Sequence, residues 1–271
     1  MKKLILALAL ACTLQAAYAQ KSDADMQKAV DKALAAASDA KKATKSATWV
    51  NLAKAYMTAY ANPTSHLTQG IDEATFTLMN KEPILSTATV ELDGQPFKKI
   101  ELSHVNVYFN PSGLMAIVEV TKPSVPGDLL AEAAKAYAKA FELGAKEKDI
   151  DPKMQEIVDA YYNDAFVAYQ LGDMAKASDL FKGAADVSVT PPCSVINDDA
   201  AYNTAFTALA SKNYARAEEY YNKCLTRNYT SEGNIYASLS ECALAKADTL
   251  AAKNFLATGL TNNTFTPCTN I

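Results

Sequence analysis

YNDAFVA at residues 162–168 and YNTAFTA at residues 202–208 are one helical motif written twice, forty positions apart. The same shift places Ala177 on Ala217. A fixed period of this size is typical of chains built from stacked helical pairs, in which each pair buries its apolar face against its neighbours. Such stacks present surfaces to partners more often than they hold catalytic groups. The sequence therefore predicts an architecture and a broad functional class, but it does not identify the partner.

Small side chains recur at the positions where the two helices of each pair would cross. Antiparallel helices approach closely only where the side chains at the crossing are small, so these positions predict the contact within each pair. On the first helices they are Ala53, Ala165, Ala205 and Ser240, and on the second helices Ala133, Ala177, Ala217 and Ala252.

These motifs resemble those of tetratricopeptide repeat (TPR) proteins. The pattern W-x2-L-A-x2-Y at residues 49–56 reproduces the first-helix motif of that repeat, with alanine in place of glycine. The pattern A-x3-Y-x2-A at residues 133–140 is similar to the second-helix motif. Full repeats follow at 157–190 and 197–230, and a looser one at 233–266. The chain looks most like an exported bacterial group whose first repeat is interrupted by a β-insert.

The resemblance implies a mainly α-helical, right-handed superhelical solenoid. Such arrays bind extended peptides or partner domains in a concave groove and carry no chemistry of their own. The family geometry places Tyr162, Phe166, Tyr169, Tyr202 and Phe206 on the wall of that groove. An aromatic stripe at helical spacing is also what a buried core would show, and the exposure of Phe166 and Phe206 distinguishes the two interpretations.

A segment with a different period separates the two helices of the first repeat, which we place at 46–61 and 127–144. Within residues 84–122, apolar and polar side chains alternate on both sides of two turns, at 90–102 and at 105–120. This pattern predicts a three- or four-stranded antiparallel β-insert. An open edge of such a sheet can accept a strand from a partner.

The first nineteen residues read as a secretory signal peptide. Lys2 and Lys3 precede an apolar run, and Ala17-Tyr18-Ala19 offers a small-x-small cleavage site. A single N-terminal helix is expected at 20–45, before the solenoid at 46–271. The sequence thus predicts export to the periplasm or to the outer membrane. A lipid-modified Cys12 is the alternative, although Ala9 stands where a lipobox would carry leucine.

Charge excludes some partner classes. Loss of Lys2 and Lys3 would take the formal charge from −4 to −6 (−4 − 2). A mildly acidic chain is not suited to nucleic acid or to an anionic membrane surface. No later stretch is long and apolar enough to predict a transmembrane helix.

Four cysteines follow the predicted signal peptide, namely Cys193, Cys224, Cys242 and Cys268. An oxidising compartment permits two disulfides, and Cys224 with Cys242 is the candidate pair because these residues fall on consecutive predicted helices. Four free buried thiols are the alternative. No CxxC spacing occurs, so a zinc site is not expected.

Signals for catalysis are weak. The chain has two histidines, His66 and His104, and we expect both to be solvated residues without a catalytic role. It has no glycine-rich phosphate loop. Asp198 and Asp199 are expected to lie at the N-terminus of a helix. We therefore predict no catalytic residues, no cofactor and no metal.

The function predicted from these features is a non-enzymatic scaffold or adaptor of the bacterial cell envelope. It would bind a protein or peptide in the concave groove, through the β-insert, or both. The alternative is a glycan- or small-ligand-binding accessory lipoprotein at the outer membrane.

The last helix carries apolar residues where a terminal repeat would be polar. Three interpretations are open for this end. The tail 261–271 folds back as a cap, with Cys268 holding it, or the apolar end is an interface, or related chains continue further.

Overall fold

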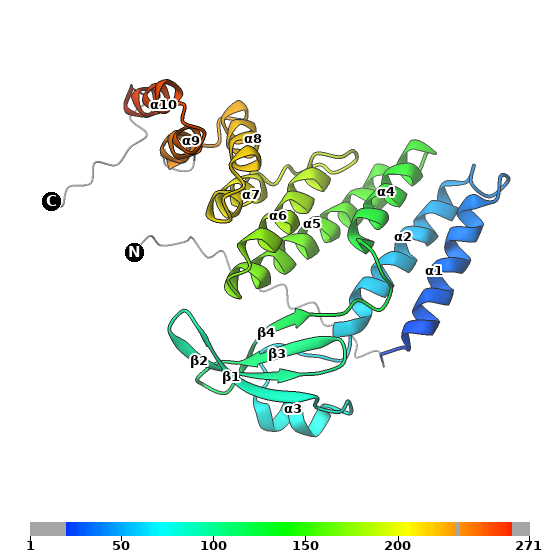
Figure 1. Ribbon diagram of the computed structural model, residues 1–271. Helices are drawn as coiled ribbons and strands as arrows, with labels where there is room; N and C mark the ends of the chain where they lie inside the picture. Colours follow the sequence, from blue (N-terminus) through cyan, green and yellow to red (C-terminus); the bar gives the residue numbers. More distant parts are fainter. Residues whose placement is uncertain (1–19, 231–233, 262–271) are drawn as a thin grey trace.

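The computed structural model describes residues 20–230 and 234–261 and is mainly α-helical, with a small antiparallel sheet (Figure 1). The predicted signal peptide, Cys12, Cys268 and the tail beyond Thr261 lie outside these residues. The helices and strands are α1 (Asp23–Ser38), α2 (Ser46–Ala61), the short 3₁₀ helix η1 (Asn62–Thr64), α3 (Glu73–Met79), β1 (Ser86–Leu92), β2 (Gln95–Glu101), β3 (Val105–Phe109), β4 (Met115–Val120), α4 (Leu129–Glu142), α5 (Glu147–Gln170), α6 (Met174–Ser188), α7 (Asp198–Ala210), α8 (Tyr214–Thr226), α9 (Asn234–Ala245) and α10 (Thr249–Thr261).

Each long helix packs against the next one along the chain, and Figure 1 shows them as a row from α1 to α10. The exception is the step across the β-insert, where α2 packs directly against α4. The sequence predicted this pairing of 46–61 with 127–144, and the structure confirms it. The small side chains predicted at the helix crossings are all buried, and Ala165 of α5 shares a cluster with Ala177 of α6.

The forty-residue repeat extends to the turns between helices. Gly172 after α5 and Lys212 after α7 both have left-handed backbones, with φ of 80° and 63°. The next residue in each turn, Asp173 or Asn213, caps the following helix by accepting a hydrogen bond from a backbone N–H three residues on. Glycine adopts this conformation at little cost, whereas Lys212 adopts it with strain.

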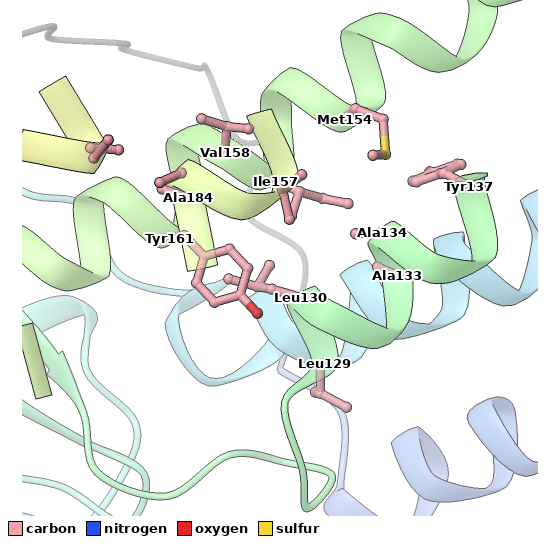
Figure 2. Packing of buried hydrophobic residues seen from close by; sticks show 14 of the residues in the cluster. Leu129, Leu130, Ala133, Ala134, Tyr137, Met154, Ile157, Val158, Tyr161 and Ala184 are labelled. Atoms are coloured by element: carbon pink, nitrogen blue, oxygen red, sulfur yellow. The ribbon is translucent and has the colours of Figure 1, made fainter. Parts of the chain in front are cut away.

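The start of α5 differs from the prediction. The repeat at 157–190 was expected to begin near Ile157, but α5 begins at Glu147 and continues through Pro152. A proline inside a helix removes one backbone hydrogen bond. The burial of Ile150 and Met154 offsets this loss, and Figure 2 shows Met154 facing Tyr137 of α4. Helix packing, not local sequence, sets this boundary.

The N-terminal helix follows its predicted start but ends early. The Ser22 hydroxyl accepts a hydrogen bond from the Asp25 amide and so caps α1. The helix ends at Ser38, before the expected end at residues 44–45. Asp198 and Asp199 lie in the first turn of α7, as expected, although Asn197 is the residue that caps it.

The β-insert is a four-stranded antiparallel meander in the order β1-β2-β3-β4, as its alternating pattern predicted. It has a hydrophobic core of its own, separate from that of the long helices. The sequence did not predict α3, which covers one face of the sheet. Phe76 of α3 meets Phe109 of β3 edge to face, with ring centroids 5.5 Å apart.

The last helix exposes apolar side chains. Leu250 and Leu260 of α10 are 69% and 67% exposed, whereas Ala252 and Gly259 are buried. The predicted cap, residues 262–271, falls outside the described part of the chain. In that part, no helix has the length and apolarity needed to cross a membrane.

Candidate functional site

Three of the five predicted groove residues form a continuous surface. Phe166 and Tyr169 of α5 stack with ring centroids 6.4 Å apart, and Tyr169 lies 6.3 Å from Phe206 of α7. All three are half-buried. We call these residues the aromatic strip. These rings lie on adjacent repeats and are neither buried in the core nor fully exposed to solvent. They therefore present apolar surface that the packed helices α5 and α7 hold in place.

A pocket continues the aromatic strip. It has a volume of about 390 Å³ and is open to solvent. Phe206 belongs to both features, because its ring also lines the pocket. Helix α7, the start of α8, the turn between them, and α9 supply the wall, which consists of Phe206, Leu209, Ala210, Lys212, Tyr214, Ser238 and Glu241. The wall therefore combines apolar and aromatic surface with one basic side chain, one acidic side chain and two that carry a hydroxyl group.

The other two predicted groove residues pack between helices. Tyr162 meets Phe181 of α6 edge to face at 5.1 Å, and its hydroxyl accepts a hydrogen bond of 2.9 Å from the Asn203 amide. Tyr202 meets Tyr221 of α8 in the same way, at 5.9 Å. The forty-residue repeat thus holds for this contact as well. These two rings position the helices that carry the aromatic strip.

Two acidic side chains hold α5 against the helices before it. The Tyr60 hydroxyl of α2 donates to Asp164 over 3.0 Å, and the Tyr161 hydroxyl donates to Asp128, the cap of α4, over 2.6 Å. Burial raises the pKa of Asp164 to about 6. These contacts fix the base from which Phe166 and Tyr169 project.

A polar cluster that the sequence analysis missed lies where the β-insert meets α1. The His104 Nε2 contacts both carboxylate oxygens of Asp23, at 2.9 and 3.1 Å, and its Nδ1 lies 3.0 Å from the Ser103 hydroxyl. That hydroxyl donates to Glu82 over 2.6 Å. The other oxygen of Glu82 lies 3.2 Å from the Nε2 of His66. We call this cluster the His104 relay.

The electrostatics of the His104 relay follow from its burial and its partners. Burial alone would raise the pKa of Asp23, but hydrogen bonds from His104 and from Lys122 hold it below its ordinary value. Burial lowers the pKa of His66, against the opposing effect of Glu82. The expectation that both histidines are simple solvated residues was therefore wrong. Their neighbours come from segments far apart in the chain, so no local motif could reveal them.

Ser103, His104 and Asp23 have the residue types of a hydrolytic triad but not its hydrogen-bond order. In such a triad the histidine accepts the serine proton. Here the Ser103 proton is directed to Glu82, the shorter contact, so His104 has no proton to accept from it. The cluster is a chain of hydrogen bonds that joins segments of the fold.

The candidate disulfide is not formed in the structure, which holds Cys193, Cys224 and Cys242 as free thiols. Cys224 of α8 and Cys242 of α9 are fully buried. Burial raises the pKa of each thiol to about 11. Because the thiolate is the form that reacts, buried and protonated thiols resist oxidation. Among residues 20–230 and 234–261, no three His, Cys, Asp or Glu side chains are grouped to hold a metal ion.

No protein-family model matches this chain, and no curated protein matches it. Among solved structures, the crystal structure of BtubC (BKLC) from P. vanneervenii aligns with 92% of this chain and 94% of that chain. The aligned residues are 12% identical and the TM-score is 0.36. A likeness this small shows neither a family nor a function.

Proposed function

We propose that this protein is a TPR-type helical solenoid that acts as a non-enzymatic scaffold, binding a protein or peptide on the surface formed by the aromatic strip and its pocket. The continuous path from Phe166 through Tyr169 and Phe206 into the pocket carries the proposal. Aromatic side chains dominate the energetics of protein interfaces, above all where they sit in rigid, partly enclosed places. The matched turns and buried small residues of successive helix pairs support the solenoid.

The pocket suggests what part of a partner would enter it. A volume of about 390 Å³ is enough for one or two large apolar side chains of a peptide. Phe206, Leu209 and Tyr214 would contact those side chains. Lys212 and Glu241 would form hydrogen bonds with the peptide backbone or ion pairs with its charged groups. An extended segment could then lie along the aromatic strip.

Site-specific crosslinking in the native cell tests the surface. A photoreactive residue at position 166 should trap a partner, whereas one at Glu219, an exposed residue of α8, should not. The trapped species is then purified and its affinity for the variant Phe206→Ala is measured. An aromatic anchor removed from an interface costs about 2 kcal/mol or more, so binding should weaken about thirtyfold.

Val195→Ala is the matched control. It removes an exposed apolar side chain from the loop between α6 and α7, away from the aromatic strip. Equal trapping at 166 and 219, or equal affinity of the Phe206→Ala and Val195→Ala variants, would contradict the proposal.

The edge of the β-insert supports a second binding mode. Strand β1 is the outer strand of the sheet, and its side chains are largely exposed. Ile84 and Leu85, just before it, are 46% and 60% exposed. Natural sheets normally protect such an edge, and an open one can accept a strand. Deleting residues 84–122 should abolish any binding that uses this edge and preserve binding to the aromatic strip.

The alternative function is binding of a glycan or another small ligand. The mixed wall of the pocket, with Tyr214, Ser238 and Glu241, favours this alternative. A glycan array probed with wild type and the Phe206→Ala variant tests it, since specific binding must be lost in the variant.

We also propose export through the first nineteen residues, with a periplasmic or outer-membrane location. Cell fractionation tests this, and palmitate labelling of wild type against Cys12→Ser tests the lipid anchor.

A further inference from the structure

Several polar contacts join the β-insert to the long helices. The insert has its own core, and β4 is the strand that contacts η1 and α5. Asn62 of η1 is buried and donates to the Ser124 hydroxyl beyond β4 over 2.8 Å. It also exchanges two hydrogen bonds of 3.0 Å with the backbone of Lys21. Polar contacts depend on geometry and charge, so they set the angle between insert and helices more than an apolar interface would.

The His104 relay lies at the same joint. Asp23 is the first residue of α1, Ser103 and His104 form the turn between β2 and β3, and Glu82 lies just before β1. The backbone carbonyl of His104 also accepts hydrogen bonds from the amides of Thr121 and Lys122, over 2.9 and 3.1 Å. The relay therefore links the segment before β1, the β2–β3 turn and the segment after β4 to the first residue of α1.

A count of protons decides the charge of His104. The contacts from Nε2 to Asp23, from Nδ1 to Ser103 and from Ser103 to Glu82 need three protons. A neutral imidazole and a serine hydroxyl supply two, and an imidazolium and a hydroxyl supply three. With a neutral ring, one of the three contacts lacks a proton, so either Asp23 or Glu82 faces an atom that cannot donate to it. All three contacts are satisfied when His104 carries a positive charge.

We propose that the His104 relay is a pH-sensitive latch that holds the β-insert at a fixed angle to α1 while His104 is protonated and releases it when His104 becomes neutral. Histidine is the side chain whose charge ordinarily changes between pH 5 and 8. The groups facing His104 are Asp23 of α1, Ser103 beside it, Lys122 after β4, and the pair Glu82 and His66. Loss of the Nδ1 proton turns the Ser103 hydroxyl toward His104 and leaves Glu82 without a donor. It also replaces the ion pair across the joint with a weaker hydrogen bond from a neutral ring to Asp23.

The latch has a consequence for binding. The insert carries the open β1 edge, and the helices carry the aromatic strip. Release of the joint changes the orientation of the β1 edge relative to the aromatic strip, while the structure of each surface stays the same. The latch is independent of the proposed function, since it holds whether or not either surface binds a partner.

Imidazole nitrogen NMR on the full-length protein tests the charge of His104. Both ring nitrogens should be protonated at about pH 6, and the variant His66→Gln assigns the signals. In Glu82→Gln, the new amide can donate to the Ser103 hydroxyl, so a neutral His104 ring satisfies every contact. His104 should therefore lose its proton at a lower pH in this variant than in wild type. A merely structural role for Glu82 would not move that transition.

Glu101→Gln is the matched control. Glu101 accepts a hydrogen bond of 2.7 Å from the Ser86 hydroxyl, the same chemistry on the same sheet but outside the chain of hydrogen bonds that includes His104. Its effect on the His104 signals should be negligible. A ring with one protonated nitrogen at about pH 6, or equal transitions in the Glu82→Gln and wild-type proteins, overturns the proposal.

A distance measurement tests the release. Spin labels attached through unnatural amino acids at positions 28 of α1 and 95 of β2, both exposed, leave the native cysteines unaltered. The wild-type distance distribution should be narrow at about pH 5.5 and broad at about pH 8. The distance distribution of the Asp23→Asn variant should be broad at both pH values, and that of the Glu82→Gln variant should be narrow at both. A wild-type distribution that does not change while His104 titrates overturns the latch.

Discussion

Gly183 of α6 packs against the ring of Tyr161, and adding one methyl group there tests whether this contact fixes α6 on α5. A Cβ built on Gly183 falls 2.6 Å from the nearest ring carbon of Tyr161, whereas ordinary contacts begin at 3.4 Å. The ring must move by about 0.8 Å (3.4 − 2.6), or the helices must separate.

The ring of Tyr161 has little freedom to move. It is 4% exposed, and Figure 2 shows it between α4 and α6, close to Leu130. Its hydroxyl donates to Asp128 over 2.6 Å, so a displacement of this size also weakens that hydrogen bond. Overpacking of a core costs about 1–3 kcal/mol, and a weakened hydrogen bond adds about 1 kcal/mol. Alanine in place of glycine inside a helix returns about 1 kcal/mol.

The variant Gly183→Ala should therefore lower the free energy of unfolding by about 2 kcal/mol. Urea unfolding followed by circular dichroism measures this change, provided that the slope of the transition stays constant. In a Tyr161→Leu background the obstruction is gone, and the same substitution should stabilise by up to about 1 kcal/mol. Stabilisation of the wild-type protein by Gly183→Ala would refute the packing argument.

Three further predictions concern the helix pairs and one buried carboxyl. Ala177→Leu places a large side chain at a fully buried crossing and should destabilise by about 1–3 kcal/mol in urea unfolding; a neutral result would mean that α5 and α6 need no small residue there. Lys212→Gly relieves a left-handed backbone and should stabilise by about 1 kcal/mol, whereas Gly172→Ala at the matching turn should destabilise by a similar amount; thermal melts that rank the two variants the other way would contradict the repeat of this turn. The pKa of Asp164 rises from 3.8 to about 6 on folding, so the folded chain holds this proton more tightly and the free energy of unfolding falls as pH rises from about 4 through about 6. Asp164→Asn keeps an acceptor for Tyr60 and should gain at most about 3 kcal/mol over wild type above pH 6 and nothing near pH 3; an equal difference at both pH values would show that the carboxyl is not desolvated.

Local pattern was enough to predict the elements that repeat or alternate. The forty-residue shift, with Ala177 on Ala217, predicted helix pairs because small residues at a crossing act over one or two turns of helix. Alternation in residues 84–122 predicted the strands because neighbouring side chains in a strand face opposite sides of the sheet. The pairing of α2 with α4 was also predictable, since each helix carries its half of one motif.

Contacts between distant segments were not predictable in this way. The start of α5 at Glu147 depends on Met154 meeting Tyr137, and α3 forms because Phe76 completes the core of the sheet. The His104 relay brings Asp23, Glu82 and His104 together from three separate parts of the chain. Such contacts follow from where the fold places each segment, and no spacing along the chain encodes them.

The five aromatic residues of the predicted groove show both cases. Helical spacing by itself determined that they belong to the first helices of two successive repeats. Tertiary packing alone decided that Tyr162 and Tyr202 lie between helices while Phe166, Tyr169 and Phe206 form the aromatic strip. The reason is that a helix assigns each side chain a direction, whereas the contacts of that side chain depend on whether the neighbouring helix supplies a ring, as Phe181 and Tyr221 do.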